Sequence, residues 1–378
     1  MATRSTRQHI VVVGGGAMGS AAAWRLAVDG YRVTLLEQFE PGHVRGASHG
    51  SSRIFRHAYA DRRYVELAAR AAALWAELEE ADGTRLLSWT GAVDHGDPAA
   101  VQGLAKVLGD AGLAYQILSP QAAAQHWPGL RFDTVVLHHA AAGRVDADRA
   151  VAVLQRRAAA AGAHVIHRST ARRLTVGRLG AEVVLDSATI KADQVVVAAG
   201  AWTSDLLGEL IALPPLRTTR EQPAHFPPID PNLVWPSFIH HPGSDLRAEG
   251  IYGLGSADGI KIGEHGTGPV VHPDTRTFDP DPIVTDRLIG YAAEWLPGVN
   301  PTLPAPVTCL YTTTPDGNFI VDRVGPITVA AGFSGHGFKF TPAIGDLISG
   351  LVSGNIRTPD LFSLNRFSGD KPVPARSA

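Results

Sequence analysis

A glycine-rich turn near the start of the sequence has the residue types needed to bind phosphate groups. Gly14, Gly16 and Gly19 form the pattern G-x-G-x-x-G directly after the apolar run 10–13. Glycines let the backbone approach a pyrophosphate, and the N-terminus of a helix that follows favours its negative charge. Glu37 ends the next apolar run, where a carboxylate can accept hydrogen bonds from ribose hydroxyls. The turn therefore predicts a dinucleotide site, and it does not distinguish FAD from NAD.

Two other segments combine cationic side chains with glycine, histidine and aromatic residues. Residues 46–59 read Gly-Ala-Ser-His-Gly-Ser-Ser-Arg-Ile-Phe-Arg-His-Ala-Tyr, and residues 332–340 read Gly-Phe-Ser-Gly-His-Gly-Phe-Lys-Phe. Cys309 is the only cysteine, which excludes an internal disulfide and leaves a single thiol to be explained. The spacing of histidine, cysteine and acidic residues suits no metal site.

The elements that must position these residues begin with a strand, a turn and a helix. The helix at 20–28 ends at Gly30 and leads into a second strand at 32–37. Further strands of the same layer are predicted at residues 164–167, 182–185 and 194–198. A strand and a turn are predicted at residues 87–97, and a further strand at 328–331. This order indicates a Rossmann-like α/β domain.

Three further helices follow from apolar periodicity and capping residues. The first spans residues 64–80, and the second spans 147–161 with Asp146 or Asp148 as its cap. The third is predicted to begin at its cap, Thr341, just after the second cationic segment. Its positive end would favour negative charge at that segment.

A second domain is predicted from a change in composition. Residues 220–261 are rich in proline, histidine and aromatic residues, and they predict irregular strands of a mixed antiparallel sheet. We therefore expect an α/β fold with two domains that interleave along the chain. The first would contain residues 1–88, 146–216 and 310–366, and the second residues 89–145 and 217–309.

Composition and charge argue against several classes of protein. The chain has 378 residues, of which 45% are apolar and 19% charged, as in an ordinary globular protein. Its net charge of -2 provides no basic surface for nucleic acid. No apolar stretch is long enough for a membrane span or forms the core of a signal peptide. We therefore expect a cytoplasmic protein.

The motifs together resemble one family of flavoproteins. The segments 46–59 and 332–340, with Thr-Cys-Leu-Tyr-Thr at 308–312 and Gly-Ala-Trp at 200–202, are similar to the family of monomeric sarcosine oxidases and N-methyltryptophan oxidases. That family belongs to the D-amino-acid-oxidase-like flavoproteins. The resemblance runs from the glycine turn to the last helix. It departs at Ser51-Ser52, where relatives have Asp-Thr, and in a shorter stretch before Lys261.

The resemblance implies FAD, a small amine substrate, oxygen and a monomer, and it suggests a role for each matching residue. The residues implied to bind the cofactor are Gly14, Gly16, Met18, Gly19, Glu37, Gly200, Cys309, Gly337 and Phe338. The thiol of Cys309 would carry the flavin through a thioether. The residues implied to bind substrate are Arg56, Lys339, Tyr252, Tyr311 and Gly335. Those implied to act in catalysis are Lys261, His49, Arg53 and His265.

These residue types suit the chemistry, although each also has a simpler interpretation. Arg56 offers a planar fork and Lys339 a point charge for a carboxylate, but they could instead be a surface ion pair and a partly buried solvent lysine. Lys261 lies between two isoleucines, so it could face solvent or, as a fixed cation, stabilise superoxide. Cys309 could be an inert buried thiol. The histidines could serve only in packing.

The implied reaction is oxidation of a secondary-amine carboxylate, such as sarcosine or another N-methyl or cyclic amino acid. The product would be an imine, which water hydrolyses, and oxygen would be reduced to hydrogen peroxide. Three alternatives remain open at this point. They are a flavin dehydrogenase, a biosynthetic oxidase of a larger amine, and a non-catalytic flavin-binding module.

Overall fold

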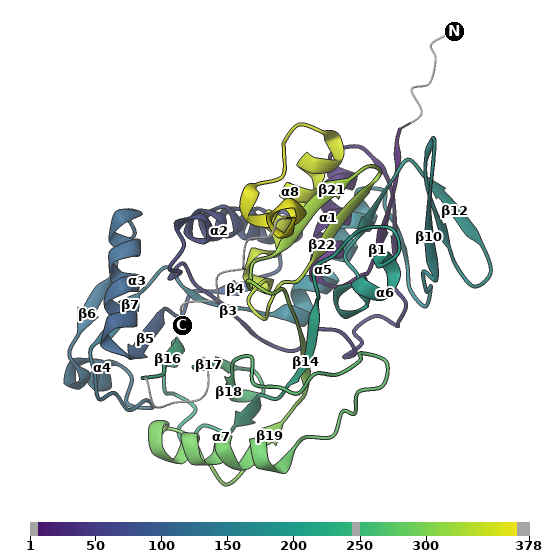
Figure 1. Cartoon of the computed structure of the whole chain (residues 1–378). Coiled ribbons are helices and arrows are strands. Elements are labelled where there is room, and N and C mark those ends of the chain that lie inside the picture. The colour runs from purple at the N-terminus through teal and green to yellow at the C-terminus, as the bar shows by residue number, and fades with distance from the viewer. Residues whose placement is uncertain (1–6, 244–249, 369–378) are drawn as a thin grey trace.

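The computed structural model describes residues 7–243 and 250–368, and its largest α/β unit is built on a six-stranded sheet (Figure 1). The strand order is β21-β22-β13-β1-β2-β9, in which only β21 runs antiparallel to its neighbour. The strands span β1 His9–Val13, β2 Arg32–Leu36, β9 His164–Ile166, β13 Gln194–Val197, β21 Ile320–Val324 and β22 Ile327–Ala331. The predicted parallel layer is confirmed.

Helices cover one face of this sheet because alternate strand residues point to opposite sides. Ile10 and Val12 pack with the helices in one core, and Val11 and Val13 belong to another. The helices on this face are α1 Ala17–Val28, α2 Arg62–Asp82, α5 Ala147–Ala160 and α8 Thr341–Ser353 (Figure 1). Asp146 is the residue that caps α5, since its side chain accepts from the Arg149 N–H.

The opposite face is covered by a small antiparallel sheet. Its strands are β10 Arg173–Gly177, β11 Gly180–Val184 and β12 Thr189–Ala192. The prediction that residues 182–185 belong to the main layer is therefore wrong. Val183 alternates with half-buried neighbours and packs beneath the main sheet, which a short apolar run cannot reveal.

An eight-stranded mixed sheet forms the second large unit. Its order is β19-β15-β18-β17-β16-β5-β7-β6, and only β5 and β16 pair in parallel. The strands are β5 Ala92–Gly96, β6 Gln116–Leu118, β7 Val136–His139, β15 Ala224–Phe226, β16 Ser237–His241, β17 Ile251–Ser256, β18 Gly259–Glu264 and β19 Ala305–Pro306. Three further helices are α3 Pro98–Asp110, α4 Pro120–His126 and α7 Pro282–Trp295. This unit confirms the predicted mixed antiparallel sheet.

Short elements join the two large sheets. The predicted strand and turn at 87–97 form two short strands, because residues 87–88 pair with residues 144–145 and residues 92–96 join the large sheet. The small pairings involve β3 Arg53–Phe55, β4 Leu87–Ser88, β8 Gly143–Val145, β14 Arg217–Glu221 and β20 Cys309–Thr313, and the remaining α-helix is α6 Thr203–Leu207. Because β14 pairs with β20, one ladder crosses the expected domain boundary.

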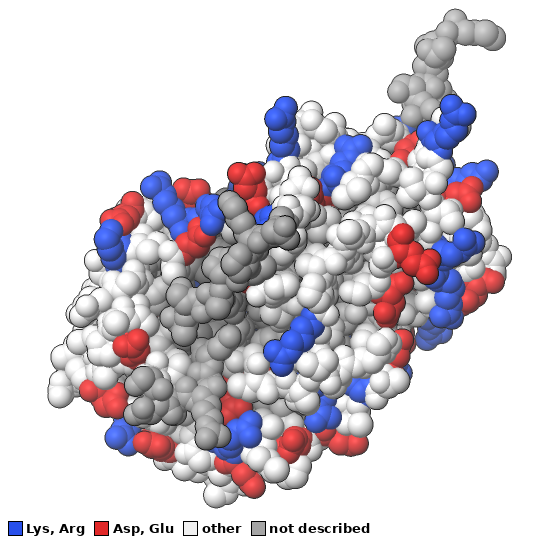
Figure 2. Space-filling view, in the orientation of Figure 1, with Lys and Arg blue, Asp and Glu red and all other residues white. Residues whose placement is uncertain are grey.

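The surface carries both signs of charge. On the face seen in Figure 2, acidic and basic side chains are interspersed. In the described part of the chain, no helix is both long and apolar enough to traverse a bilayer.

Candidate active site

A pocket of about 450 Å³ lies where the predicted cofactor residues converge. This volume falls in the usual range for ligand pockets. The predicted residues that line it are Gly14, Gly16, Met18, Glu37, His49, Arg53, Gly200, Cys309, Tyr311, Gly335, Gly337 and Phe338. Segments separated by some 300 residues in sequence thus share one wall, as the family resemblance implies.

Gly19 does not line the pocket, although the sequence pattern places it with Gly14 and Gly16. A Cβ at Gly19 would collide with the carbonyl oxygen of Gly14, so this glycine allows β1 and α1 to pack closely. Gly14 has a φ of 104°, a left-handed conformation that glycine adopts readily. The pattern therefore combines a tight turn, a close approach and a helix–strand contact.

Glu37 shapes the glycine turn from the end of β2. Its carboxylate accepts the Gly15 N–H at 2.7 Å and the Phe39 N–H at 2.9 Å. Burial raises the pKa of Glu37, but the hydrogen bonds from His43, Phe39 and Gly15 outweigh burial and hold the pKa below its usual value. The sequence predicted a ribose contact, and it did not reveal this bond to the turn itself.

The first turn of α1 presents backbone donors to the pocket. Its N-cap, Gly16, has no side chain, and Ser48 accepts the Ala17 N–H at 3.0 Å. A helix N-terminus beside a pocket is a site for a phosphate anion, so these residues fit a dinucleotide such as FAD.

The N-terminus of α8 differs in detail from the prediction. Phe340 is the N-cap, and Thr341 is already helical, with its hydroxyl donating to the Phe338 carbonyl at 2.6 Å. The prediction that Thr341 caps this helix is therefore wrong. The helix still begins directly after the pocket-lining residues Gly337 and Phe338.

Cys309 is half-buried in the pocket wall at the start of β20. Its sulfur lies 3.9 Å from Nη2 of Arg53. Burial raises the pKa of the Cys309 thiol, but the neighbouring His49 imidazole and the Arg53 and Lys261 cations outweigh burial and lower it to about 6. The thiol is therefore largely a thiolate at neutral pH, and a thiolate is the reactive form of cysteine.

Lys261 faces inward from β18. Its neighbours Ile260 and Ile262 pack in the core on the other side of the sheet, and Lys261 itself is 7% exposed. Its ammonium donates to the Ser52 carbonyl at 3.4 Å. Burial, with a smaller contribution from Arg53, lowers the pKa of Lys261 to about 7. The interpretation of Lys261 as a solvent-facing lysine is thus excluded.

Two predicted tyrosines and a histidine adjoin this region. Tyr252 and Tyr311 interact through their hydroxyl groups, and burial raises the pKa of both phenols. The ring of His265 lies 5.2 Å from that of Tyr311, measured between ring centroids. A Cβ at Gly335 would collide with the Tyr311 ring, so this glycine lets the 332–340 loop close over the tyrosine.

Arg56 and Lys339 both contact the side chain of Tyr59. The Lys339 ammonium donates to the Tyr59 hydroxyl at 2.7 Å and to the His336 carbonyl at 2.9 Å. The Arg56 guanidinium lies 5.3 Å from the centre of the Tyr59 ring. Burial, and then the Arg56 charge, lower the pKa of Lys339 well below its usual value. The simpler interpretation of each residue, a surface ion pair for Arg56 and a solvent lysine for Lys339, is therefore excluded.

Sequence reasoning missed two residues of this cluster. Tyr59 belongs to the quoted 46–59 segment but received no role. Asp94, a wholly buried acid in β5, forms an ion pair with Arg56 at 2.9 Å. The sequence could have singled out Asp94 as a lone acidic residue in the buried strand Ala92–Gly96.

Comparisons with known proteins agree with this geometry. Residues 9–351 match the family model for FAD dependent oxidoreductases, named DAO. The chain is 32% identical to monomeric sarcosine oxidase of Bacillus sp. (strain B-0618), over 96% of this chain and 97% of that one. It is 27% identical to N-methyl-L-tryptophan oxidase of Salmonella dublin, over 96% and 100%.

A solved structure extends the likeness to three dimensions. NikD, described as an unusual amino acid oxidase essential for nikkomycin biosynthesis, superposes with a TM-score of 0.83 at 26% identity. The match covers 93% of this chain and 96% of that one. From the family match and the pocket that fits its cofactor, the chain belongs to the DAO family of FAD-dependent oxidoreductases.

Proposed function

We propose that this protein oxidises a small secondary-amine carboxylate, such as sarcosine or another N-methyl or cyclic amino acid, and reduces oxygen to hydrogen peroxide. The observation that carries the proposal is the pair Arg56 and Lys339, which both contact Tyr59. Neither cation lines the cofactor pocket, but Lys339 directly follows the pocket-lining residue Phe338. Two cations in a largely buried setting fit one carboxylate, which is the group that all amino acid substrates share.

The side chains of the protein would orient the substrate and stabilise charge. Arg56 and Lys339 would hold the carboxylate and thereby fix which C–H bond faces the cofactor. When bound, FAD would accept the electron pair of that C–H bond and later pass it to oxygen. Lys261, a buried lysine on the facing sheet, would supply positive charge where oxygen gains electrons. Water would then hydrolyse the imine, giving formaldehyde if the substrate is N-methylated.

Covalent attachment of the flavin through Cys309 is part of the proposal. The lowered pKa of its thiol and its place in the pocket wall support this role. Attachment needs a nucleophilic sulfur, which a thiolate provides and a neutral thiol does not.

A panel of amines tests the proposed substrate class. The purified yellow protein is mixed with sarcosine, N-methyltryptophan, proline and glycine, and hydrogen peroxide and aldehyde are measured. Peroxide release from a secondary amino acid, in a one-to-one ratio with oxygen consumed, is expected. Oxidation with an artificial electron acceptor but not with oxygen would instead indicate a dehydrogenase. Activity confined to bulky amines would indicate a biosynthetic oxidase, and no oxidation of any amine a non-catalytic module.

The remaining expectations are proposals of the same kind. We propose a monomer in the cytoplasm, which sedimentation and cell fractionation would test. The domain boundaries at residues 88, 145, 216 and 309 are likewise proposed. The strands of the eight-stranded sheet fall within 92–139 and 224–306, which supports the division.

A further inference from the structure

Asp94 is a buried acid to which the proposed function gives no role. It lies in β5 with 0% of its surface exposed. Its partners across the ladders are Ile239 of β16 and Leu137 of β7, so the strand is held on both sides. Since cross-strand partners share a face, Asp94, Ile239 and Tyr252 point to the same side of the sheet.

On that side of the sheet, Asp94 contacts Arg56. Oδ1 of Asp94 accepts from Nη1 of Arg56 at 2.9 Å and from Nε2 of His241 at 2.8 Å. Burial alone raises the pKa of Asp94, but Arg56 and His241 outweigh burial and lower it below its usual value. Asp94 is therefore a carboxylate anion at neutral pH. An anion here is a costly feature in a buried strand unless its partners compensate it.

Arg56 is consequently held in two directions. Its Nη1 edge is bound by Asp94, and its flat face lies over the Tyr59 ring. Arginine has five N–H donors, so donors remain for a substrate carboxylate after Asp94 is bound. Burial lowers the pKa of Lys339, and a carboxylate bound beside its amine would favour the charged form again.

We infer that Asp94 is a positioning residue for substrate recognition, which fixes the Arg56 guanidinium so that its free N–H donors meet the substrate carboxylate. His241 holds Asp94 in turn. The inference rests on the proposed function, because it needs a carboxylate substrate. Preorganised arginine loses less side-chain freedom on binding, which increases the affinity without a new contact to substrate. Asp94 therefore acts on the substrate through Arg56.

The test compares one amino acid with its own carboxamide. The substrate is whichever of sarcosine, N-methyltryptophan and proline releases most peroxide from the wild-type protein. Asp94→Asn keeps the shape of the side chain and removes its charge. We expect KM for the amino acid to rise about tenfold or more while kcat at saturation changes about twofold or less. KM for the carboxamide, which lacks the anion, should hardly change.

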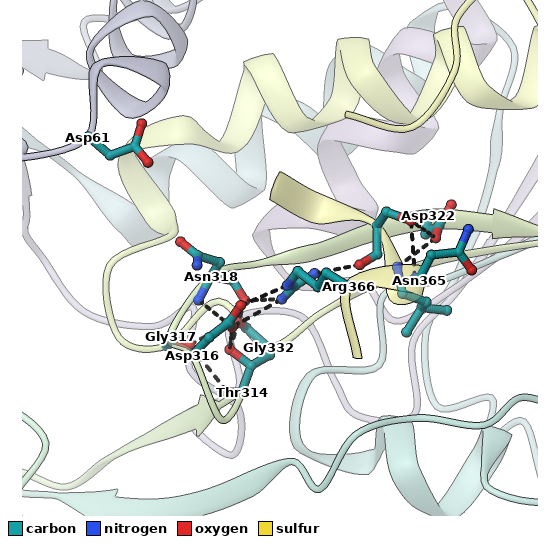
Figure 3. A network of polar contacts seen from close by, with 12 residues as sticks. Asp61, Thr314, Asp316, Gly317, Asn318, Asp322, Gly332, Asn365 and Arg366 are labelled. Atoms are coloured by element: carbon teal, nitrogen blue, oxygen red, sulfur yellow. Dashed lines mark hydrogen bonds and ion pairs between the residues drawn. The ribbon is translucent and has the colours of Figure 1, made fainter. Parts of the chain in front are cut away.

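A half-buried ion pair elsewhere in the chain supplies the control. Arg366 and Asp316 form an ion pair at 2.8 Å between η4 (Leu364–Phe367) and the turn after β20, as Figure 3 shows. Their side chains are 14% and 15% exposed, and the hydrogen-bond partners of Asp316 include none of the proposed substrate-binding residues. Asp316→Asn should lower the melting temperature and leave both KM values unchanged.

The possible outcomes separate this inference from the proposed function. If the wild-type protein oxidises none of the amines, the proposed function fails first. If it does and Asp94→Asn leaves the KM for the amino acid unchanged, the pair is only structural and the inference is overturned. A lower KM in Asp94→Asn would overturn it differently, because Asp94 would then compete with substrate for Arg56.

Two more measurements keep the test decisive if Asp94→Asn folds poorly. His241 is partly exposed, so His241→Ala removes one contact to Asp94 at a smaller structural cost. His241→Ala should also raise KM for the amino acid, but by less than Asp94→Asn does. Titration of the holoenzyme with acetate, followed by flavin absorbance, reports carboxylate binding without turnover. Equal acetate affinity in wild-type protein and both variants would contradict the inference.

Discussion

Lys339 illustrates, at the scale of one residue, how a binding group reduces stability. Lys339→Met removes a buried ammonium and keeps the length of the side chain. We expect KM for the amino acid to rise strongly, since a charge-assisted contact to a desolvated carboxylate contributes about 2–4 kcal/mol. The free energy of unfolding should stay the same or increase, because burial disfavours the charge. Steady-state kinetics and urea unfolding measure both effects, and an unchanged KM would place the carboxylate site elsewhere.

Lys261 gives a prediction with a pH dependence. Its pKa of about 7 means that the ammonium form is lost as pH rises through neutrality. If the ammonium activates oxygen, the rate of flavin reoxidation should be highest below pH 7 and fall above it. Lys261→Met should slow reoxidation by about 100-fold or more and abolish this pH dependence, while anaerobic reduction by substrate changes little. Stopped-flow absorbance separates the two steps, and equal slowing of both would indicate a general structural role.

Cys309 gives a prediction about the cofactor bond. Acid precipitation of the wild-type protein should leave the yellow colour in the pellet. Cys309→Ser should release FAD to the supernatant, because a serine hydroxyl is not ionised near neutral pH. Mass spectrometry of the intact chain checks the added mass. Free FAD from the wild-type protein would refute the attachment.

At the scale of elements, the packing of α1 against α8 controls the shape of the cofactor domain. A Cβ at Gly345 of α8 would lie 2.7 Å from the Ala21 carbonyl oxygen of α1. Gly345→Ala should therefore force the helices apart and lower the free energy of unfolding by about 1–3 kcal/mol. Gly290→Ala in α7 is the control, since no atom lies within 4 Å of its Cβ. The control should be neutral or stabilising by up to about 1 kcal/mol, and similar effects of both would contradict this account.

The sequence predicted elements well where one local pattern determines them. The β1–turn–α1–β2 unit follows from apolar runs and glycines, and the structure confirms it. Residues 182–185 were misplaced because a run of four apolar and polar residues does not reveal its sheet. Thr341 was taken as a cap because threonine and proline often begin helices, yet a 3-10 turn at Phe338–Phe340 shifts the start of α8.

At the scale of the whole molecule, the site depends on contacts between distant segments. Arg56, Lys339 and Lys261 could be named from their motifs. The Asp94–Arg56 pair, however, joins residues 38 positions apart, one in β5 and the other just after the end of β3. No periodicity links them. The charge of Asp94 was visible in the sequence, whereas the face of β5 that carries it depends on pairing with β16 and β7. Long-range pairing is what the sequence patterns could not predict.

One measurement tests the central claim, that amine oxidation and oxygen reduction occur at the same flavin. The purified holoenzyme is mixed without oxygen with the best amino acid of the panel, and the flavin absorbance is followed. The solution is then mixed with oxygenated buffer. We predict rapid bleaching in the first step, rapid return of the colour in the second, and one hydrogen peroxide per flavin. Bleaching without a rapid return of colour would show that oxygen is not the acceptor, and no bleaching with any of the amino acids would contradict the proposed function.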